Sequence, residues 1–253
     1  MKPFLSVCFF LILLHLSMTL FAQGEKDNSK PTNVYSQVDN YFEYATGPGY
    51  HTYGYNPRLS YTPNEDNLIL VDLPFKYHSV SQKFGLSDVR VRYFNIPYRD
   101  YSKTFGSFGV SLDVTAPVGN YDHQLGSSSW RLSPGLTCGI MADKTGTLSF
   151  FPTLSYTYTT KPTAENVPEE LNEADHGANF QVLASYVIND DAFFLLTPIW
   201  DMKDVDDARE DEFILEAELV FDIFRDKFQC GVFYRGAFQS KLYAYSLNFT
   251  LFL

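Results

Sequence analysis

The chain has 253 residues, 45% hydrophobic and 17% aromatic, with a formal charge of -11 and a mean hydropathy of -0.16. This much aromatic surface can offset the entropy cost of folding, which excludes a disordered chain, and the acidic balance argues against nucleic acid as a partner. After the N-terminus, no run of the sequence approaches the ~20 apolar residues that a membrane-spanning helix needs. What remains is one aromatic-rich domain that favours β-structure.

The first 22 residues have the layout of a secretory signal peptide. A short basic start precedes an almost unbroken apolar stretch over residues 4–21, and Ala22 is a small residue suited to cleavage. Leu20 is bulkier than usual for its position before the cleavage point, so an uncleaved anchor stays an alternative. We expect export with cleavage after Ala22, a flexible periplasmic leader over residues 23–34, and a folded domain over residues 35–253.

The rest of the chain alternates with period two, which indicates β-strands. In the last segment, apolar side chains occupy the odd-numbered positions from Tyr243 to Leu253, while Ala244 to Thr250 supply small or polar side chains at the even-numbered ones. The same pattern recurs along the domain and predicts an all-β fold. The predicted strands are 35–45, 52–61, 67–77, 87–98, 106–116, 127–140, 146–160, 177–188, 192–200, 211–224, 228–236 and 240–253.

The lengths of these strands and of their connections favour a closed, antiparallel, up-and-down transmembrane β-barrel of about 12 strands, in a range of 10–14. Globular strands average ~5–6 residues and membrane-spanning ones ~9–11, and the predicted strands are of the longer kind. The connections alternate between short turns and long loops, of which the longest are 161–176 and 201–210. An even strand number places both termini in the periplasm and the long loops outside a Gram-negative outer membrane.

Aromatic residues gather near the predicted outer ends of the strands, as an interfacial girdle does. The alternative is a soluble core filled by these rings, which would give them no reason to gather at one end. The expected girdle consists of Trp130, Tyr156, Tyr158, Trp200, Tyr243 and Tyr245.

Charged residues fall on the predicted inward faces of the strands. Opposed acidic and basic ladders would set a transverse field in a pore and select solutes, whereas a salt-bridged network would fill a closed lumen. Both interpretations stay open for a barrel of this size. The expected lumen charge network consists of Arg58, Asp72, Lys76, Asp88, Arg90, Arg92, Asp113, Arg131, Glu216, Glu218, Asp222 and Arg235.

The sequence gives little sign of catalysis, cofactors or metals. All histidines of the mature chain fall in predicted outer loops or strand ends, and no spacing selects a nucleophile or a base; they are His51, His78, His123 and His176. The acidic segment 201–212 lacks the ligand spacing and central glycine of an EF-hand, which leaves weak cation bridging or a solvated loop. We expect no catalytic residues, no metal and no cofactor, with Cys138 and Cys230 as free thiols on lipid-facing positions.

The middle of the chain resembles a known family on the motifs Gly85-Leu86-Ser87-Asp88, Pro117-Val118-Gly119, Leu125-Gly126-Ser127-Ser128-Ser129-Trp130 and Pro134. These turn and strand-start motifs are similar to those of the phenol-degradation-pathway family of transporter-like outer-membrane barrels. Three motif positions differ, Ser87, Val118 and Ser128, and the resemblance covers about residues 84–160. The alternating C-terminal strand also resembles the signal that the barrel-assembly machinery reads, although it ends on Leu253 instead of an aromatic residue.

The resemblance implies a passive channel or transporter for small molecules, hydrophobic or aromatic ones among them. Two other classes of function stay open: a closed structural or surface-interaction barrel without transport, and an outer-leaflet hydrolase with a histidine at the outer rim. The expected partners are outer-membrane lipid, the barrel-assembly machinery through the C-terminal strand, and a small-molecule solute.

Overall fold

The protein is described by a computed structural model that covers residues 35–99, 104–143, 146–169, 172–202, 211–224 and 227–253. The predicted signal peptide and the leader 23–34 lie outside the described residues. The same is true of residues 203–210 in the acidic segment.

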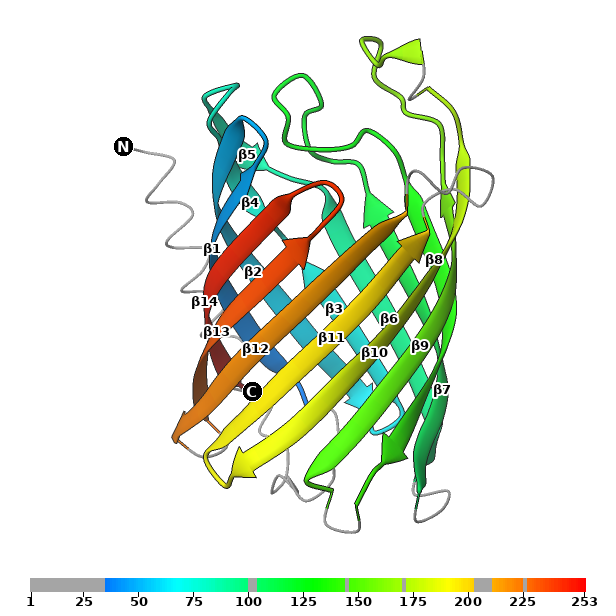
Figure 1. The fold of residues 1–253 in the computed structure, drawn as a ribbon, viewed down its shortest axis with the longest axis vertical. Coiled ribbons are helices and arrows are strands. Elements are labelled where there is room, and N and C mark those ends of the chain that lie inside the picture. The colour runs from blue at the N-terminus through cyan, green and yellow to red at the C-terminus, as the bar shows by residue number, and fades with distance from the viewer. Residues whose placement is uncertain (1–34, 100–103, 144–145, 170–171, 203–210, 225–226) are drawn as a thin grey trace.

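Fourteen strands form one antiparallel sheet, and the sheet closes into a barrel of twelve strands with two further short ones (Figure 1). This confirms the predicted fold class. The strands are β1 Gln37–Gly47, β2 Tyr50–Asn64, β3 Asn67–Asp72, β4 Phe75–His78, β5 Lys83–Leu86, β6 Val89–Arg99, β7 Phe105–Ala116, β8 Arg131–Met141, β9 Leu148–Thr159, β10 Asp175–Asn189, β11 Ala192–Met202, β12 Glu212–Phe224, β13 Phe228–Ala237 and β14 Leu242–Phe252.

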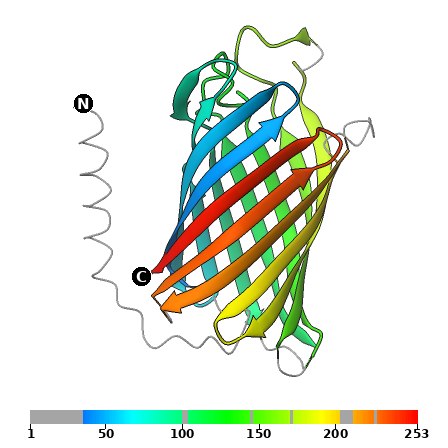
Figure 2. The ribbon, with the colours of Figure 1, turned by 60° about the vertical axis from the view of Figure 1, so that its left-hand side comes forward.

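The first and last strands close the barrel. β1 pairs with β2 along its whole length and with β14 from Gln37↔Phe252 to Thr46↔Tyr243. The two strands lie side by side in the ribbon (Figure 2). Closure leaves neither β1 nor β14 with an unpaired edge, which removes the template for aggregation that an open sheet would carry.

One predicted strand is interrupted, and one short strand was not predicted. The segment 67–77, predicted as one strand, is divided into β3 and β4 at Leu73–Pro74, and β5 precedes β6 with a break at Ser87–Asp88. Pro74 has no N–H to donate to a strand ladder, and its carbonyl instead accepts a hydrogen bond from the Ser87 N–H (2.7 Å). β3 therefore pairs with β6, whereas β4 pairs with β5, and these breaks produce the two additional strands.

The barrel has two distinct ends. Short connections, such as 65–66 and 190–191, lie at the end where β1 starts and β14 finishes, and we call this the turn end. The opposite end, which we call the loop end, carries the segments 117–130, 160–169 and 172–174 and the β1–β2 hairpin. That hairpin turns through Pro48-Gly49, where Gly49 has a φ of 81°, the left-handed conformation that a type II turn requires.

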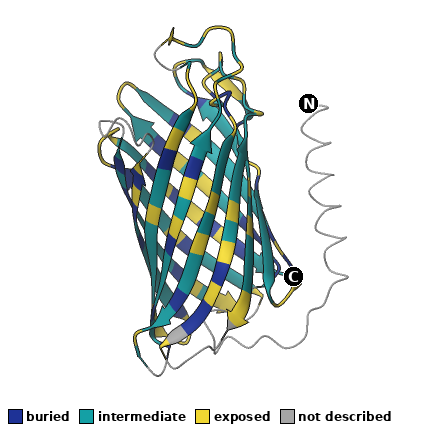
Figure 3. Cartoon of the chain, turned by 90° about the vertical axis from the view of Figure 1, so that its right-hand side faces the viewer, coloured by how far each residue is buried: buried dark blue, intermediate teal, exposed yellow. Residues whose placement is uncertain are grey.

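The distribution of polarity is inverted relative to a soluble protein. Buried residues of the described chain are mostly polar, for example Ser60, Thr157 and Asn248, whereas large apolar side chains such as Leu154 and Leu247 are more than half exposed. Buried and exposed residues alternate along the strands (Figure 3). The outer wall is thus apolar and the interior polar, which is the arrangement of a barrel surrounded by lipid. Among the described residues there is no helix that could cross a membrane.

Candidate functional site: the charged interior

A row of acids and bases crosses the interior wall from strand to strand. The register aligns Asp39 of β1 with Arg58 of β2, Arg58 with Asp72 of β3, and Asp72 with Arg90 of β6. Because side chains of cross-strand partners lie on the same face of a sheet, these four charges alternate in sign along one interior row. Strand alternation and register together position this part of the site.

Asp72 is the centre of this row. Its carboxylate accepts hydrogen bonds from Arg58 Nε at 2.6 Å and from Arg92 Nη2 at 3.1 Å, and the residue is only 4% exposed. Arg58 also donates to the Tyr41 hydroxyl at 3.0 Å and stacks 4.9 Å above its ring. Asp39 is held by Thr250 Oγ1 at 2.7 Å and Gln37 Nε2 at 2.9 Å.

Further ion pairs hold the remaining charges. Arg90 donates through Nε to the Asp113 carboxylate at 2.8 Å, and Arg235 pairs with Glu216 at 3.1 Å. Arg131 of β8 reaches Asp201 of β11 at 2.7 Å and therefore spans the two strands between them. In the same manner Asn248 of β14 reaches across β13 to donate a hydrogen bond to Glu218 of β12.

Of the three interior cavities that we describe, the largest has a volume of about 570 Å³, and charges of opposite sign line different sides of it. Arg90 and Arg92 of β6 line one side, and Glu216 and Glu218 of β12 line another. In the strand order, β12 lies six steps from β6 in either direction around the twelve-strand barrel, so the arginines and the glutamates occupy opposite walls. Opposed walls of this kind impose a transverse electric field on the space between them.

Two smaller cavities adjoin this one inside the barrel. One of about 310 Å³ lies toward the turn end and is lined by Asp39, Gln229 and Leu70 among others. Another of about 260 Å³ lies beside β7 to β9, extends to β6 and to β10 to β13, and includes Asp113 and Arg131. The volumes are in the range of small-molecule sites, ~300–1,000 Å³, or just below it.

The structure places the twelve sequence-predicted charges as follows. Nine line the largest cavity: Arg58, Asp72, Lys76, Asp88, Arg90, Arg92, Glu216, Glu218 and Arg235. Asp113 and Arg131 line the cavity beside β7 to β9, and Asp222 is in register with Gln229 near the turn end.

The sequence prediction missed four residues that belong to this interior, Asp39, Tyr41, Glu43 and Asp201. The first three alternate with the outward-facing Phe42 and Tyr44 within one strand, so the period-two pattern could have identified them. Asp201 follows Trp200 at the end of a predicted strand and was assigned to the acidic loop.

Asp88 anchors a loop. Its carboxylate accepts hydrogen bonds from the Gly119 N–H at 3.1 Å, the Ser127 N–H at 2.7 Å and the Ser127 hydroxyl at 2.8 Å. A side chain on Gly126 would meet the Asp88 carboxylate and, at 2.7 Å, the Gly119 Cα, so this close approach requires glycine. The residues that carry the family resemblance thus fix segment 117–129 to the break between β5 and β6.

The predicted girdle residues lie toward the loop end on the outer wall. Trp130, Trp200, Tyr156 and Tyr245 are 45–52% exposed, and Tyr158 and Tyr243 are half-buried. Trp200 packs between Phe180 (ring centroids 5.7 Å apart) and Phe213 (5.3 Å), which extends the ring contacts over three strands.

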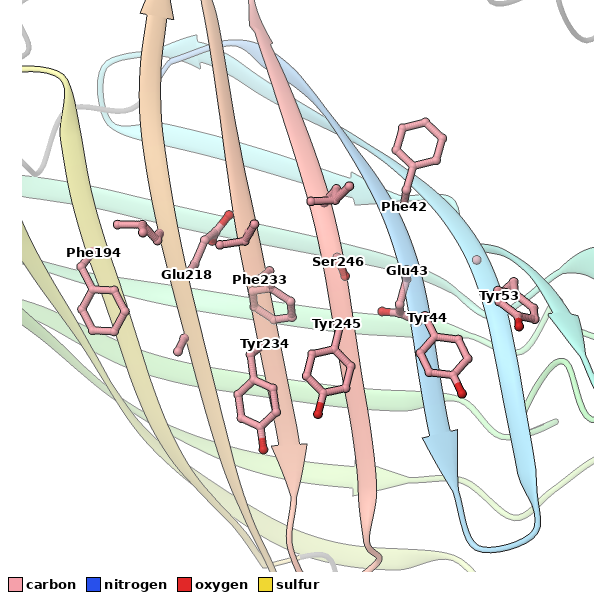
Figure 4. Close-up of a pocket in the computed structure, with 15 residues that line it drawn as sticks. Phe42, Glu43, Tyr44, Tyr53, Phe194, Glu218, Phe233, Tyr234, Tyr245 and Ser246 are labelled. Carbon is pink, nitrogen blue, oxygen red and sulfur yellow. The ribbon is translucent and has the colours of Figure 1, made fainter.

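A shallow pocket of about 770 Å³ lies over β1, β2 and β11 to β14 (Figure 4). Tyr44, Tyr234 and Tyr245 lie side by side there with their hydroxyls toward the same end of the barrel, and Glu43 and Ser246 alternate with them along the strands. The pocket lining is mainly apolar, which is the chemistry of a surface that meets acyl chains.

The four histidines of the described residues take part in ring contacts or loop contacts. His78 stacks on Tyr50 at 5.0 Å, His51 packs 5.5 Å from Tyr53, and the Tyr156 hydroxyl bonds His176. The Ser81 hydroxyl donates to the His123 carbonyl at 2.7 Å. Within the described part of the chain, no three His, Cys, Asp or Glu residues are grouped to hold a metal ion.

Cys138 and Cys230 are free thiols, as the sequence predicts. Cys138 is in register with Phe108, and Cys230 with Phe221 and Phe249, so both side chains belong to the apolar outer face.

Comparison with known proteins supports the fold and does not assign a family. No protein-family model matches the sequence, and a search of curated proteins found no match. Among solved structures, the chain is similar to the NanC porin (TM-score 0.61, 13% identity, 85% of this chain and 100% of that one) and to the KdgM porin in complex with disordered oligogalacturonate (0.58, 12%, 86% and 99%). It is similar as well to an outer membrane channel from Pseudomonas putida F1 (0.60, 14%, 91% and 100%). The chain therefore has the fold of outer-membrane porin-like barrels.

Proposed function

We propose that this protein is a passive outer-membrane channel for small molecules. The observation that carries the proposal is the polar interior cavity with arginines of β6 opposite glutamates of β12, inside an outer wall of apolar side chains. A barrel satisfies its backbone hydrogen bonds within lipid, and a wet, charged lumen gives a solute a route that the bilayer core does not offer. The fold shared with porin-like channels supports the same function.

The solutes that fit this interior are amphipathic. The largest cavity combines its charged walls with apolar side chains, Leu183, Leu195 and Phe233. A small molecule with a hydrocarbon or aromatic body and a polar group can place each part against a matching surface. We therefore extend the proposal to small solutes that include hydrophobic and aromatic compounds.

The test is conductance of the refolded protein in planar bilayers, together with swelling of proteoliposomes in small solutes. We expect discrete ion-conducting steps and faster swelling than in protein-free vesicles. Absence of permeability to every small solute would reject the channel.

A closed barrel is the second candidate function. The contacts that favour it span the lumen wall over several strands, from Arg131 to Asp201 and from Glu218 to Asn248. Replacing Arg90 and Arg92 by glutamine distinguishes the two. A channel changes its ion selectivity and keeps most of its stability, whereas a filled barrel loses stability because Asp113 is left unpaired.

The outer-membrane location and the partners form part of the proposal. The apolar outer wall would contact lipid, the loop end would face outward, and the last strand, which closes the barrel against β1, would be read by the barrel-assembly machinery. Folded barrels migrate differently on gels before and after boiling. We expect this shift and recovery of the protein with outer membranes, and recovery as a soluble periplasmic protein would contradict the proposal.

A further inference from the structure

Two oppositely charged interior side chains lie in one row of the sheet without forming an ion pair. Glu43 of β1 is in register with Gly54 of β2, and Gly54 is in register with Lys76 of β4. The three residues therefore occupy one interior row, with glycine in the middle. Among the described residues, neither the Glu43 side chain nor the Lys76 side chain has a hydrogen-bond or ion-pair partner.

The neighbouring charges already have partners. Arg58 and Arg92 share Asp72, and Arg235 pairs with Glu216. Glu218 accepts a hydrogen bond from Asn248. These arginines and carboxylates already use most of their hydrogen-bonding groups in these contacts. A solute that binds one of them must therefore displace its present partner. Glu43 and Lys76 differ because a solute would gain a charge partner on either side without displacing one.

Space for a solute lies between the two charges. Glu43, Gly54 and Lys76 all line the cavity of about 570 Å³, and both charged residues are half-buried. A side-chain carbon on Gly54 would lie 3.7 Å from both Glu43 Cβ and Lys76 Cγ, so any larger residue would fill the gap between them. With strands ~4.8 Å apart, the Cα atoms of residues two strands apart lie roughly 10 Å from each other.

We propose that Glu43 and Lys76 form a binding subsite for zwitterionic solutes, such as amino acids and very short peptides. The solute's ammonium group binds the Glu43 carboxylate, and its carboxylate binds the Lys76 ammonium. Gly54 leaves room for the atoms between these groups, and Phe233 offers an apolar surface in the same cavity. The inference rests on the proposed channel function, because it is the channel that gives solutes access to this row.

The test measures binding directly, by ligand-observed NMR titration of the refolded protein in detergent micelles. The probe is 4-aminobutyrate, compared with butyrate, butylammonium and the uncharged butyramide. We expect the zwitterion to bind more tightly than any of the three, and both Glu43→Gln and Lys76→Met to weaken its binding about fivefold, the effect of one partly solvated charge pair. The matched controls Glu173→Gln and Lys161→Met change exposed loop residues and should leave binding unchanged.

A second variant gives a sharper result. Exchanging the two charges in Glu43→Lys/Lys76→Glu should restore zwitterion binding, because the solute can bind in the reverse orientation, and neither single reversal should do so. Equal binding of 4-aminobutyrate and butyramide by the wild-type protein would overturn the subsite, as would a loss confined to Lys76→Met. Channel conductance is measured separately, so a conducting protein without zwitterion preference rejects the subsite alone, and a non-conducting one rejects the proposed function.

Discussion

Removing the Asp72 carboxylate tests whether the interior charges stabilise the barrel. Asp72 is 4% exposed and is bonded to Arg58 at 2.6 Å and Arg92 at 3.1 Å. Asp72→Ala would leave two arginines without their shared counter-ion. Arg92 would lose its ion pair with Asp72, while its Nε already lacks a hydrogen-bond partner among the described atoms. Breaking a buried pair in this way costs about 3–5 kcal/mol.

Water in the lumen reduces that cost. The side chains of Arg58 and Arg92 are 25% and 18% exposed, so part of their charge can be hydrated after the carboxylate is removed. We therefore expect Asp72→Ala to lower the free energy of unfolding by about 2–3 kcal/mol, and Asp72→Asn, which keeps a hydrogen-bond acceptor, by about half as much.

The assay is equilibrium urea unfolding in phospholipid vesicles, followed by the fluorescence of Trp130 and Trp200. Glu43→Gln is the matched control, because it neutralises an interior acid that has no ion-pair partner among the described residues, and it should change stability by less than about 0.5 kcal/mol. A loss below about 0.5 kcal/mol for Asp72→Ala, or an equal loss in the control, would show that this ion-pair cluster does not stabilise the barrel.

Three further predictions follow from the outer wall and the loop end. Brominated lipids should quench the fluorescence of Trp130 and Trp200 most strongly when the bromine lies near the headgroup, since both rings are nearly half exposed at one end of the barrel. Maximal quenching by bromine at the bilayer centre would contradict the aromatic girdle. Asp88→Ala should raise amide exchange in segment 117–129 about tenfold or more, because three hydrogen bonds to the carboxylate are lost, and unchanged exchange would show that the loop is held by other contacts. Cys138 and Cys230 should resist a membrane-impermeant maleimide in vesicles and react after unfolding, and rapid labelling of the folded protein would place them in water.

The strand pattern can be predicted from the sequence alone, because alternation is a local property. Each strand carries its apolar side chains on one face, as Tyr245 and Leu247 do on β14, and the closed barrel only orients those faces outward. The same parity identified most of the interior charges, and it would have identified Asp39 and Glu43 if it had been applied to β1.

The contacts between charged side chains, in contrast, depend on the tertiary structure. Arg131 and Asp201 are separated by 70 positions and by two intervening strands, so their contact depends on the curvature of the closed barrel. Asp88 follows the alternation of a strand, yet its carboxylate binds a loop that begins 29 residues later, at Pro117. Glu43 and Lys76 belong to one interior row only because both are in register with Gly54 of β2. Periodicity fixes the face on which a side chain lies, whereas register and closure, which depend on the whole sheet, fix its partner.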